Sequence, residues 1–186
     1  PEGNGFVSAA KRIPVDDPSA QIWLLHGGPG SSGTIGLAEL MLEIHQIAPD
    51  LEIFTIDYRG TGGSEYLGCP EQEHPESVEG ENISFDEIEP CVEHFREEHG
   101  HEPEVFSYTS SARDLLASLD AMREPGLPVF IWGGSGGTVW AQRLLQIAPN
   151  AVDGVILEGV ATPDFSLALQ EQYADTVMRR ILELCS

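Results

Sequence analysis

Four short apolar runs, separated by stretches of helical periodicity, constrain the fold of this 186-residue chain more than any other feature. Each run is nearly continuous instead of alternating, which is typical of strands buried on both faces of a parallel sheet. The runs are Gln21–Leu25, Leu51–Ile56, Pro128–Trp132 and Val152–Leu157. Apolar residues at three- and four-residue spacing predict helices over Leu37–Ile47, Leu115–Met122 and Thr138–Ala148. We therefore expect an α/β fold with a mostly parallel, doubly wound sheet and right-handed crossovers.

Two further elements are expected outside this alternation. An earlier strand is predicted within Phe6–Val15, and a last helix within Leu167–Leu184. Residues 71–104 break the pattern, because they hold 13 acidic residues, a single arginine and four of the six histidines. The histidine spacing does not match a zinc-binding helix, so we expect a solvated acidic excursion over 69–105 and no metal site. Loose calcium binding by the carboxylates is the alternative.

The charge of the chain excludes several classes of partner. There are 31 Asp and Glu against 9 Lys and Arg, a formal net charge of −22. Such a surface repels phosphate backbones and anionic lipid, so we expect no nucleic-acid partner and no membrane docking. No run approaches 18 apolar residues, so no membrane span is expected.

The sequence Gly133-Gly134-Ser135-Gly136-Gly137 follows one predicted strand and precedes a predicted helix. This is the G-x-S-x-G pattern in the strand–turn–helix context that gives it meaning. The sharp turn admits only small neighbours and lifts the serine oxygen clear, at the positive end of the following helix. A phosphate-binding loop would carry a lysine after its glycines, and none is present. Ser135 is therefore the candidate nucleophile, with Gly133 and Gly137 as supporting residues.

A second glycine-rich loop, His26-Gly27-Gly28-Pro29-Gly30, directly follows the first buried strand. Its glycines free backbone N–H groups to point into a pocket, so Gly28 and Gly136 are the expected donors to a developing oxyanion. His26 lies at the start of the loop, where we expect its ring, with Gly27, to brace the turn instead of acting as a base.

The third motif, Asp57-Tyr58-Arg59-Gly60-Thr61-Gly62-Gly63-Ser64, follows the strand Leu51–Ile56. Its role is predicted to be structural, with Asp57 and Arg59 binding neighbouring loops. Asp57 as the acid of a catalytic triad is a minor alternative.

These motifs come in the order of the α/β-hydrolase fold. The chain more narrowly resembles the prolyl iminopeptidase and tripeptidyl aminopeptidase family of serine peptidases. The resemblance covers most of residues 20–184 and is carried by the stretches 26–30, 57–64, 108–115, 134–143 and 152–160. One departure is Gly136, where relatives usually carry tyrosine or tryptophan, which leaves the substrate preference open.

The resemblance implies an aminopeptidase that releases residues from peptide N-termini. Ser135 would attack the scissile carbonyl, and water would release the acyl-enzyme. A peptide is the implied substrate, and no metal or organic cofactor is implied. A carboxylesterase or lipase with the same fold is the first alternative. A non-catalytic binding protein on a hydrolase fold is the second.

The expected triad is incomplete in this sequence. In this fold the order is Ser, then Asp or Glu, then His, yet no histidine follows Ser135. Glu158 and Asp164 are candidates for an unusual acid, but neither replaces a histidine. We therefore expect an N-terminal part of a longer peptidase, inactive alone, with residues 1–160 from the hydrolase core and 161–186 opening a helical cap.

The three cysteines are Cys69, Cys91 and Cys185. The segment between the first two has little apolar content, so we expect a Cys69–Cys91 disulfide and an extracellular or periplasmic location. Three free thiols in a cytosolic protein are the alternative. Cys185 is then left over, and it is a candidate for linking the chain to its missing C-terminal half.

Overall fold

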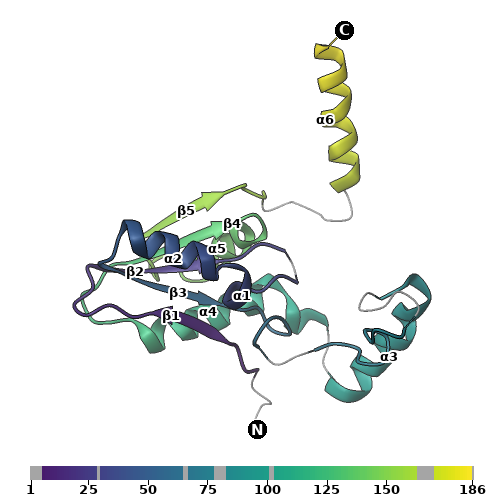
Figure 1. Cartoon of the computed structure of the whole chain (residues 1–186), viewed down its shortest axis with the longest axis horizontal. Helices are drawn as coiled ribbons and strands as arrows, with labels where there is room; N and C mark the ends of the chain where they lie inside the picture. The colour runs from purple at the N-terminus through teal and green to yellow at the C-terminus, as the bar shows by residue number, and fades with distance from the viewer. Residues whose placement is uncertain are drawn as a thin grey trace.

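A computed structural model describes residues 6–28, 30–64, 67–77, 83–100, 103–162 and 170–185 of the chain. Its centre is a five-stranded sheet in the order β1-β3-β2-β4-β5 (Figure 1). The strands are β1 (Ala10–Ile13), β2 (Ala20–Leu25), β3 (Leu51–Ile56), β4 (Val129–Gly134) and β5 (Gly154–Glu158). β1 runs antiparallel to β3, and the other pairs are parallel. This confirms the expected, mostly parallel α/β fold.

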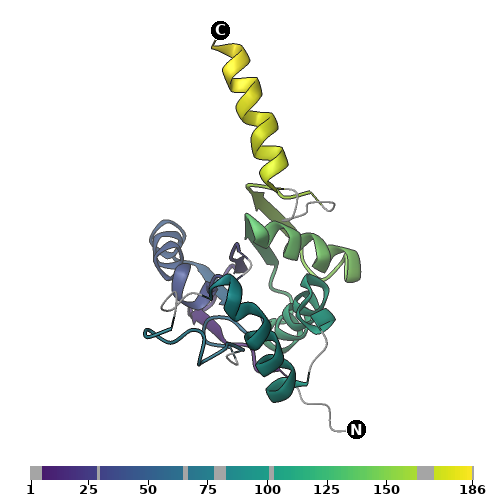
Figure 2. The same cartoon turned by 90° about the vertical axis from the view of Figure 1, so that its right-hand side faces the viewer.

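Helices cover both faces of the sheet (Figures 1 and 2). α1 (Gly33–Gly36) and α2 (Ala38–Ile47) follow β2, while α4 (Tyr108–Met122) and α5 (Gly136–Ile147) flank β4 in the sequence. α2 packs on one face, where Met41 joins Ile22 and Leu24. α4 and α5 pack on the other face, where their apolar residues join Trp23 and Leu25. Every residue of β2 is buried, as its continuous apolar run predicts.

The acidic excursion contains a helix that the sequence pattern did not predict. Residues expected to form a solvated loop fold as η1 (Phe85–Glu87), α3 (Ile88–His99) and η2 (Pro103–Phe106). Ser84 donates its N–H to the Glu87 carboxylate at 2.9 Å, and Gly100 ends α3 with a left-handed φ of 58°. Local capping therefore defines a helix whose few apolar residues give only a weak periodic signal.

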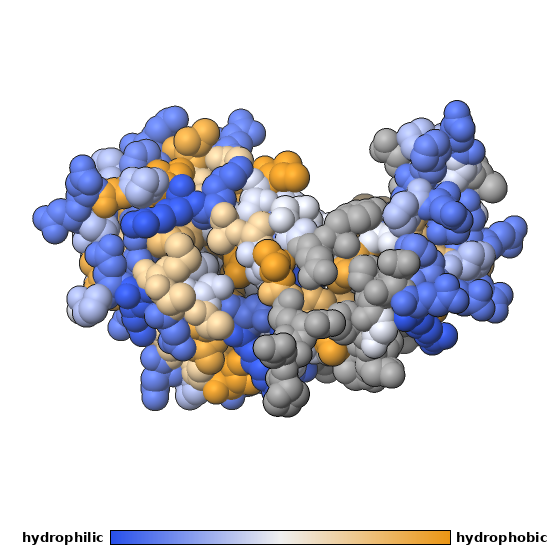
Figure 3. All heavy atoms as spheres, turned by 90° about the horizontal axis from the view of Figure 1, so that it is seen from below, coloured by the Kyte–Doolittle hydropathy of each residue, from blue (hydrophilic) through white to orange (hydrophobic). Residues whose placement is uncertain are grey.

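The excursion is solvated all the same. Val92 is 40% exposed, and no described side chain of α3 is fully buried. The end of the molecule that carries α3 presents mainly hydrophilic side chains (Figure 3). Among the residues that the structure describes, no group of three or more His, Cys, Asp or Glu is placed to hold a metal ion.

A disulfide joins Cys69, in the segment after β3, to Cys91 on α3, in agreement with the expected pairing. The two Cα atoms are 5.3 Å apart. Phe95 of α3 also contacts Phe106 edge-on, with ring centroids 5.3 Å apart. The disulfide thus joins α3 to the first residue of the acidic excursion, and the aromatic contact holds α3 to Phe106, just beyond the last residue of the excursion.

Alkylation should detect this disulfide directly. Cys185 is free and exposed, so iodoacetamide should add one group to the native chain and three after reduction. Reduction should also lower the free energy of unfolding by about 3 kcal/mol, because the bond closes a loop of 22 residues in the unfolded chain. Intact mass and melting with and without reductant measure both effects. Three groups added before reduction would contradict the pairing.

The last helix, α6 (Gln170–Leu184), projects away from the sheet (Figures 1 and 2). It lies within the helix predicted for Leu167–Leu184, of which residues 167–169 lie outside the described part. Its apolar residues remain largely exposed, including Tyr173, Val177 and Ile181. No helix in the described ranges has the length and apolar character needed to cross a membrane.

Candidate active site

Ser135 lies at a sharp turn between β4 and α5, in an unusual backbone conformation. Its φ is 50° and its ψ is −118°, a region that is costly for a residue with a side chain. Three hydrogen bonds fix the turn. Ser135 donates its N–H to the Glu158 carbonyl at 2.8 Å, while the backbone N–H and the hydroxyl of Thr138 donate to the Ser135 carbonyl at 2.9 and 2.6 Å. The residue itself is exposed. The turn therefore presents a strained, accessible serine, as the G-x-S-x-G pattern predicts.

Gly133 and Gly137 must be glycine because other backbone segments pass very close to them. A Cβ on Gly137 would lie 2.2 Å from the carbonyl oxygen of Leu25. A Cβ on Gly133 would lie 2.6 Å from the carbonyl oxygen of Gly137. Because real Cβ contacts are longer than this, any side chain at these positions would push α5 away from the ends of β2 and β4.

The structure explains why position 136 is glycine and not the tyrosine or tryptophan expected from the resemblance. A Cβ there would lie 2.4 Å from the Gly28 carbonyl oxygen and 2.8 Å from the Tyr108 hydroxyl oxygen. The glycine is thus required by the way the loop after β2 rests on the turn. A tyrosine or tryptophan at this position would need a different course of that loop.

The loop after β2 lies directly against the serine. A Cβ on Gly27 would be 3.0 Å from the Ser135 Cβ and 3.5 Å from its Oγ. Gly28 has a φ of 106°, and its carbonyl oxygen faces Gly136. The structure therefore brings the main chain of residue 28 against that of residue 136, the two expected oxyanion donors, next to Ser135. Pro29 lies outside the described residues.

The ring of His26 is buried beneath this loop. Its Nδ1 lies 2.9 Å from the carbonyl oxygen of Gly27, which can only accept, so Nδ1 carries the proton. The ring packs edge-on against Tyr58, at 4.5 Å between centroids. Burial lowers the pKa of His26, despite its hydrogen bond to Gly27 and the Asp57 carboxylate 4.0 Å from Nε2. A neutral, buried ring that holds its own loop fits the expected bracing role.

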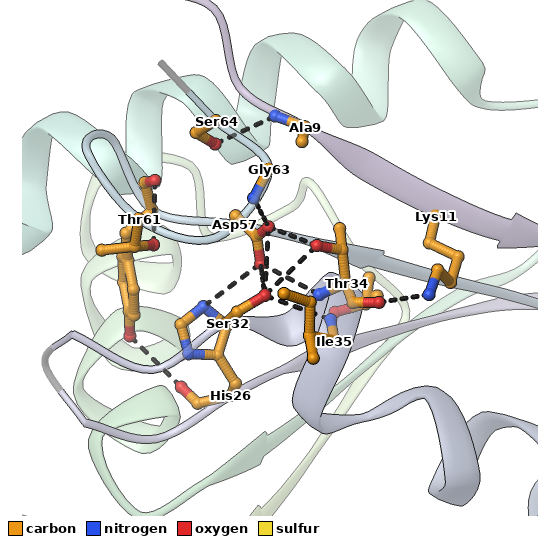
Figure 4. Close-up of polar contacts among 12 residues, drawn as sticks. Ala9, Lys11, His26, Ser32, Thr34, Ile35, Asp57, Thr61, Gly63 and Ser64 are labelled. Carbon is orange, nitrogen blue, oxygen red and sulfur yellow. Dashed lines mark hydrogen bonds and ion pairs between the residues drawn. The ribbon is translucent and has the colours of Figure 1, made fainter. Parts of the chain in front are cut away.

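Asp57 is a buried carboxylate that ties the 57–64 turn to the start of α1 (Figure 4). It accepts the backbone N–H groups of Thr34 and Gly63, both at 2.9 Å, and the hydroxyls of Thr34 and Ser32. Burial alone would raise the pKa of Asp57, but the hydrogen bonds from Thr34 and Gly63 hold it below its ordinary value. The contacts support the structural role expected from the sequence. The sequence pattern does not indicate that Thr34 binds Asp57, because the two residues are 23 positions apart.

Replacing Asp57 by alanine should lower the free energy of unfolding by about 3 kcal/mol, because it leaves buried N–H groups without acceptors. The folded pKa of Asp57 is lower than the unfolded value of 3.8, so its contribution is fully present above that value. The contribution should disappear as the pH falls through the folded pKa. Denaturant unfolding at pH 7 and at a series of decreasing pH values below 3.8 tests both statements.

The exposed Asp120 on α4 provides the matched control. Asp120→Ala should change the free energy of unfolding by no more than about 0.5 kcal/mol. If the two variants unfold alike, or if the cost of Asp57→Ala is as large in acid as at pH 7, Asp57 does not hold the turn.

Arg59 fixes the other side of the same turn. Its Nε and Nη2 donate to the two carboxylate oxygens of Asp114 at 2.5 and 2.7 Å, and Nη1 donates to the Val105 carbonyl at 2.9 Å. Its guanidinium also lies over the Phe6 ring, 4.5 Å from the centroid. These contacts agree with the loop-binding role expected for Arg59, but its partner Asp114 is 55 positions away and no sequence pattern points to it.

An open pocket of about 350 Å³ lies beside Ser135. Its walls include Leu37, Trp132 and Glu158. Glu158 also accepts the Ser135 N–H through its main chain, whereas Asp164, the other candidate acid, lies outside the described residues. Serine, backbone donors and an open pocket together make an arrangement suited to acyl transfer.

Comparison with known proteins agrees with this geometry. The family model described as serine aminopeptidase, S33, matches residues 16–184. No protein sequence with curated function matches the chain.

Solved structures show the same fold at low identity. A proline iminopeptidase-related protein from Thermus thermophilus is 19% identical, with a TM-score of 0.51, over 82% of this chain and 42% of that one. A carboxylesterase from the thaumarchaeon Nitrososphaera is 15% identical, with a TM-score of 0.58, over 95% of this chain and 50% of that one. The proline iminopeptidase of Mycobacterium smegmatis is 14% identical, with a TM-score of 0.52, over 83% of this chain and 40% of that one.

The chain thus spans half or less of the length of these three structures. The family match extends over nearly the whole sequence and includes the Ser135 turn, the loop after β2 and the 57–64 turn. The chain belongs to the serine aminopeptidase S33 family and has an α/β-hydrolase fold.

Proposed function

We propose that this chain carries the nucleophile and the oxyanion donors of a serine hydrolase that releases residues from peptide N-termini. The observation that carries the proposal is the strained Ser135 turn, with the main chain of Gly28 resting against Gly136. Strain at a non-glycine residue persists where the surrounding structure enforces it, and it is found most often at functional sites.

The chemistry follows from these groups. Ser135 Oγ attacks the carbonyl carbon of the substrate, and the carbonyl oxygen gains the negative charge. The backbone N–H groups of Gly28 and Gly136 stabilise this oxyanion. The base that takes the Ser135 proton gives it to the leaving amine as the C–N bond breaks. The same base then takes a proton from water, which attacks the ester, and returns it to Ser135 as the acid is released.

A general base is required for the first step, and the sequence after Ser135 contains no histidine. His26 is unsuited to the role, because its Nδ1 proton is bound to Gly27 and its Nε2 lies toward Asp57. The chain spans about half the length of the solved structures it matches. We therefore assign the base to a histidine outside these 186 residues, contributed to the same site.

A carboxylesterase is the second candidate, favoured by the carboxylesterases among the structural neighbours. A substrate panel separates the two candidates. Aminoacyl amides with a free α-amine should be cleaved faster than the same amides with an acetylated amine, if the protein is an aminopeptidase. Fast turnover of acyl esters without turnover of any aminoacyl amide would assign it to the esterases.

We also propose that the protein works outside the cytosol, in an oxidising compartment. The Cys69–Cys91 disulfide supports this, because such bonds persist where thiols are not kept reduced. The strongly acidic surface is compatible with an extracellular protein. Fractionation of the native source, followed by immunodetection, tests the location. A purely cytosolic signal would contradict it.

A further inference from the structure

A second pocket shares the loop after β2 with the Ser135 pocket, since Gly30 lines one and Gly27 lines the other. Its volume is about 190 Å³, and Tyr58, Arg59, Thr61, Phe106 and Tyr108 form most of its wall. Gly30 stands at its mouth, since this residue is exposed and a Cβ there would meet no atom within 4 Å. An apolar cavity of about 150 Å³ is large enough to hold a benzene ring.

The pocket adjoins the expected oxyanion donors. Tyr108, one of its walls, places its hydroxyl oxygen 2.8 Å from where a Cβ of Gly136 would lie. Gly30, at the mouth, follows Gly28 by two residues. A substrate carbonyl held by the N–H groups of residues 28 and 136 would therefore lie within a few bonds of the mouth of the pocket.

Three aromatic residues, Tyr58, Phe106 and Tyr108, form part of the described wall of the pocket, and the one charged residue in that wall is paired. The charge of the Arg59 guanidinium is paired with the Asp114 carboxylate, and its Nη1 also donates to the Val105 carbonyl. Burial raises the pKa values of Tyr58 and Tyr108, so both phenols are neutral. Their rings meet edge-on at 5.5 Å between centroids. Such a wall favours a neutral ring, which gains edge-to-face contacts, over an ammonium or a carboxylate.

The pocket is also firmly held. Phe106 packs edge-on against Phe95 of α3 and against Phe6, at 5.3 and 5.5 Å between centroids. Tyr58 stacks on Trp140 of α5 at 4.0 Å. Because α3 is itself bound through the Cys69–Cys91 disulfide, the acidic excursion supports one wall of the pocket.

We infer that this second pocket is a specificity subsite that binds a neutral aromatic ring on the acyl side of the substrate. The inference rests on the proposed function for its link to catalysis. The preferred substrates would then carry an aromatic group one to three bonds from the scissile carbonyl, with the ring seated against Tyr108 and Phe106.

Binding can be measured without any reaction at Ser135. The probes are 3-phenylpropanamide and propanamide, which differ by the ring alone, titrated by ligand-observed NMR. The phenyl compound should bind at least tenfold more tightly than propanamide, to the native chain and to Ser135→Ala alike. Equal binding of the two compounds would overturn the subsite.

Two substitutions locate the ring. Phe106→Ala should weaken binding of 3-phenylpropanamide about tenfold by removing one wall of the pocket. Phe85→Ala, at a ring that is 92% exposed, is the matched control and should leave binding unchanged. Thr61→Phe should block binding because the larger side chain fills the pocket. This second variant provides the test if Phe106→Ala fails to fold. Unaltered binding in folded Phe106→Ala or Thr61→Phe would overturn the assignment.

The subsite and the proposed function fail in different ways. If Ser135 does not react with a fluorophosphonate at any imidazole concentration while the phenyl compound binds as expected, the nucleophile assignment fails and the subsite stands. If Ser135 reacts but the ring adds nothing to binding, the subsite fails and the nucleophile stands.

Discussion

Ser135→Ala should abolish covalent labelling of the protein by a fluorophosphonate. In a site with all of its catalytic groups, the same substitution should lower turnover by about 10⁶-fold. Loss of the nucleophile of a complete catalytic triad has an effect of this size. The loss has one cause, because alanine differs from serine only by the missing hydroxyl. Intact mass after labelling in the presence of imidazole measures the first effect. Initial rates on an activated ester, taken with the site complete, measure the second.

Ser31→Ala is the matched control for this prediction. Ser31 is exposed in the loop after β2, close to the site but outside the strained turn. It should label and turn over like the native protein. Labelling that survives in Ser135→Ala, or that disappears in Ser31→Ala, would place the reactive hydroxyl elsewhere.

Gly136→Ala should cost roughly 10²–10³ in the rate of acylation, the effect of losing one oxyanion donor. The added Cβ would lie 2.4 Å from the Gly28 carbonyl oxygen, so the main chain of one of the two residues must move. Either movement separates the pair of N–H groups expected to bind the oxyanion. Single-turnover acylation rates of an activated ester should fall, with a smaller change in ester affinity.

Gly36→Ala controls for the removal of a glycine. A Cβ at Gly36, the last residue of α1, would meet no atom within 4 Å, so acylation should proceed at the native rate. If Gly136→Ala acylates as fast as Gly36→Ala, the main chain of residues 28 and 136 does not form the oxyanion site.

The sheet could be predicted because its signal is local. The runs Gln21–Leu25 and Leu51–Ile56 are buried on both faces, so each is continuously apolar and nearly matches the bounds of β2 and β3. The turn at Ser135 could be predicted for the same reason, since its glycines stand next to one another in the sequence. A strand, a sharp turn and a helix follow directly from that order.

Contacts between distant residues could not be predicted in the same way. The Arg59–Asp114 pair joins residues 55 positions apart, and the clash that requires Gly136 involves a loop more than 100 residues earlier. Helix α3 could not be predicted because its apolar repeat is weak in an acidic segment. The disulfide and the Phe95 contact hold this helix in place, so it needs fewer buried apolar residues than the other helices. These features depend on the tertiary structure, which no local pattern encodes.

The central claim is that Ser135 is a nucleophile awaiting a base, and chemical rescue tests it most directly. The native chain is incubated with a fluorophosphonate in increasing concentrations of imidazole, and the adduct is located by peptide mass mapping. We predict an adduct on the peptide that contains Ser135, formed at a rate that rises with imidazole and absent from Ser135→Ala. An adduct on another residue, or no adduct at any imidazole concentration, would contradict the account.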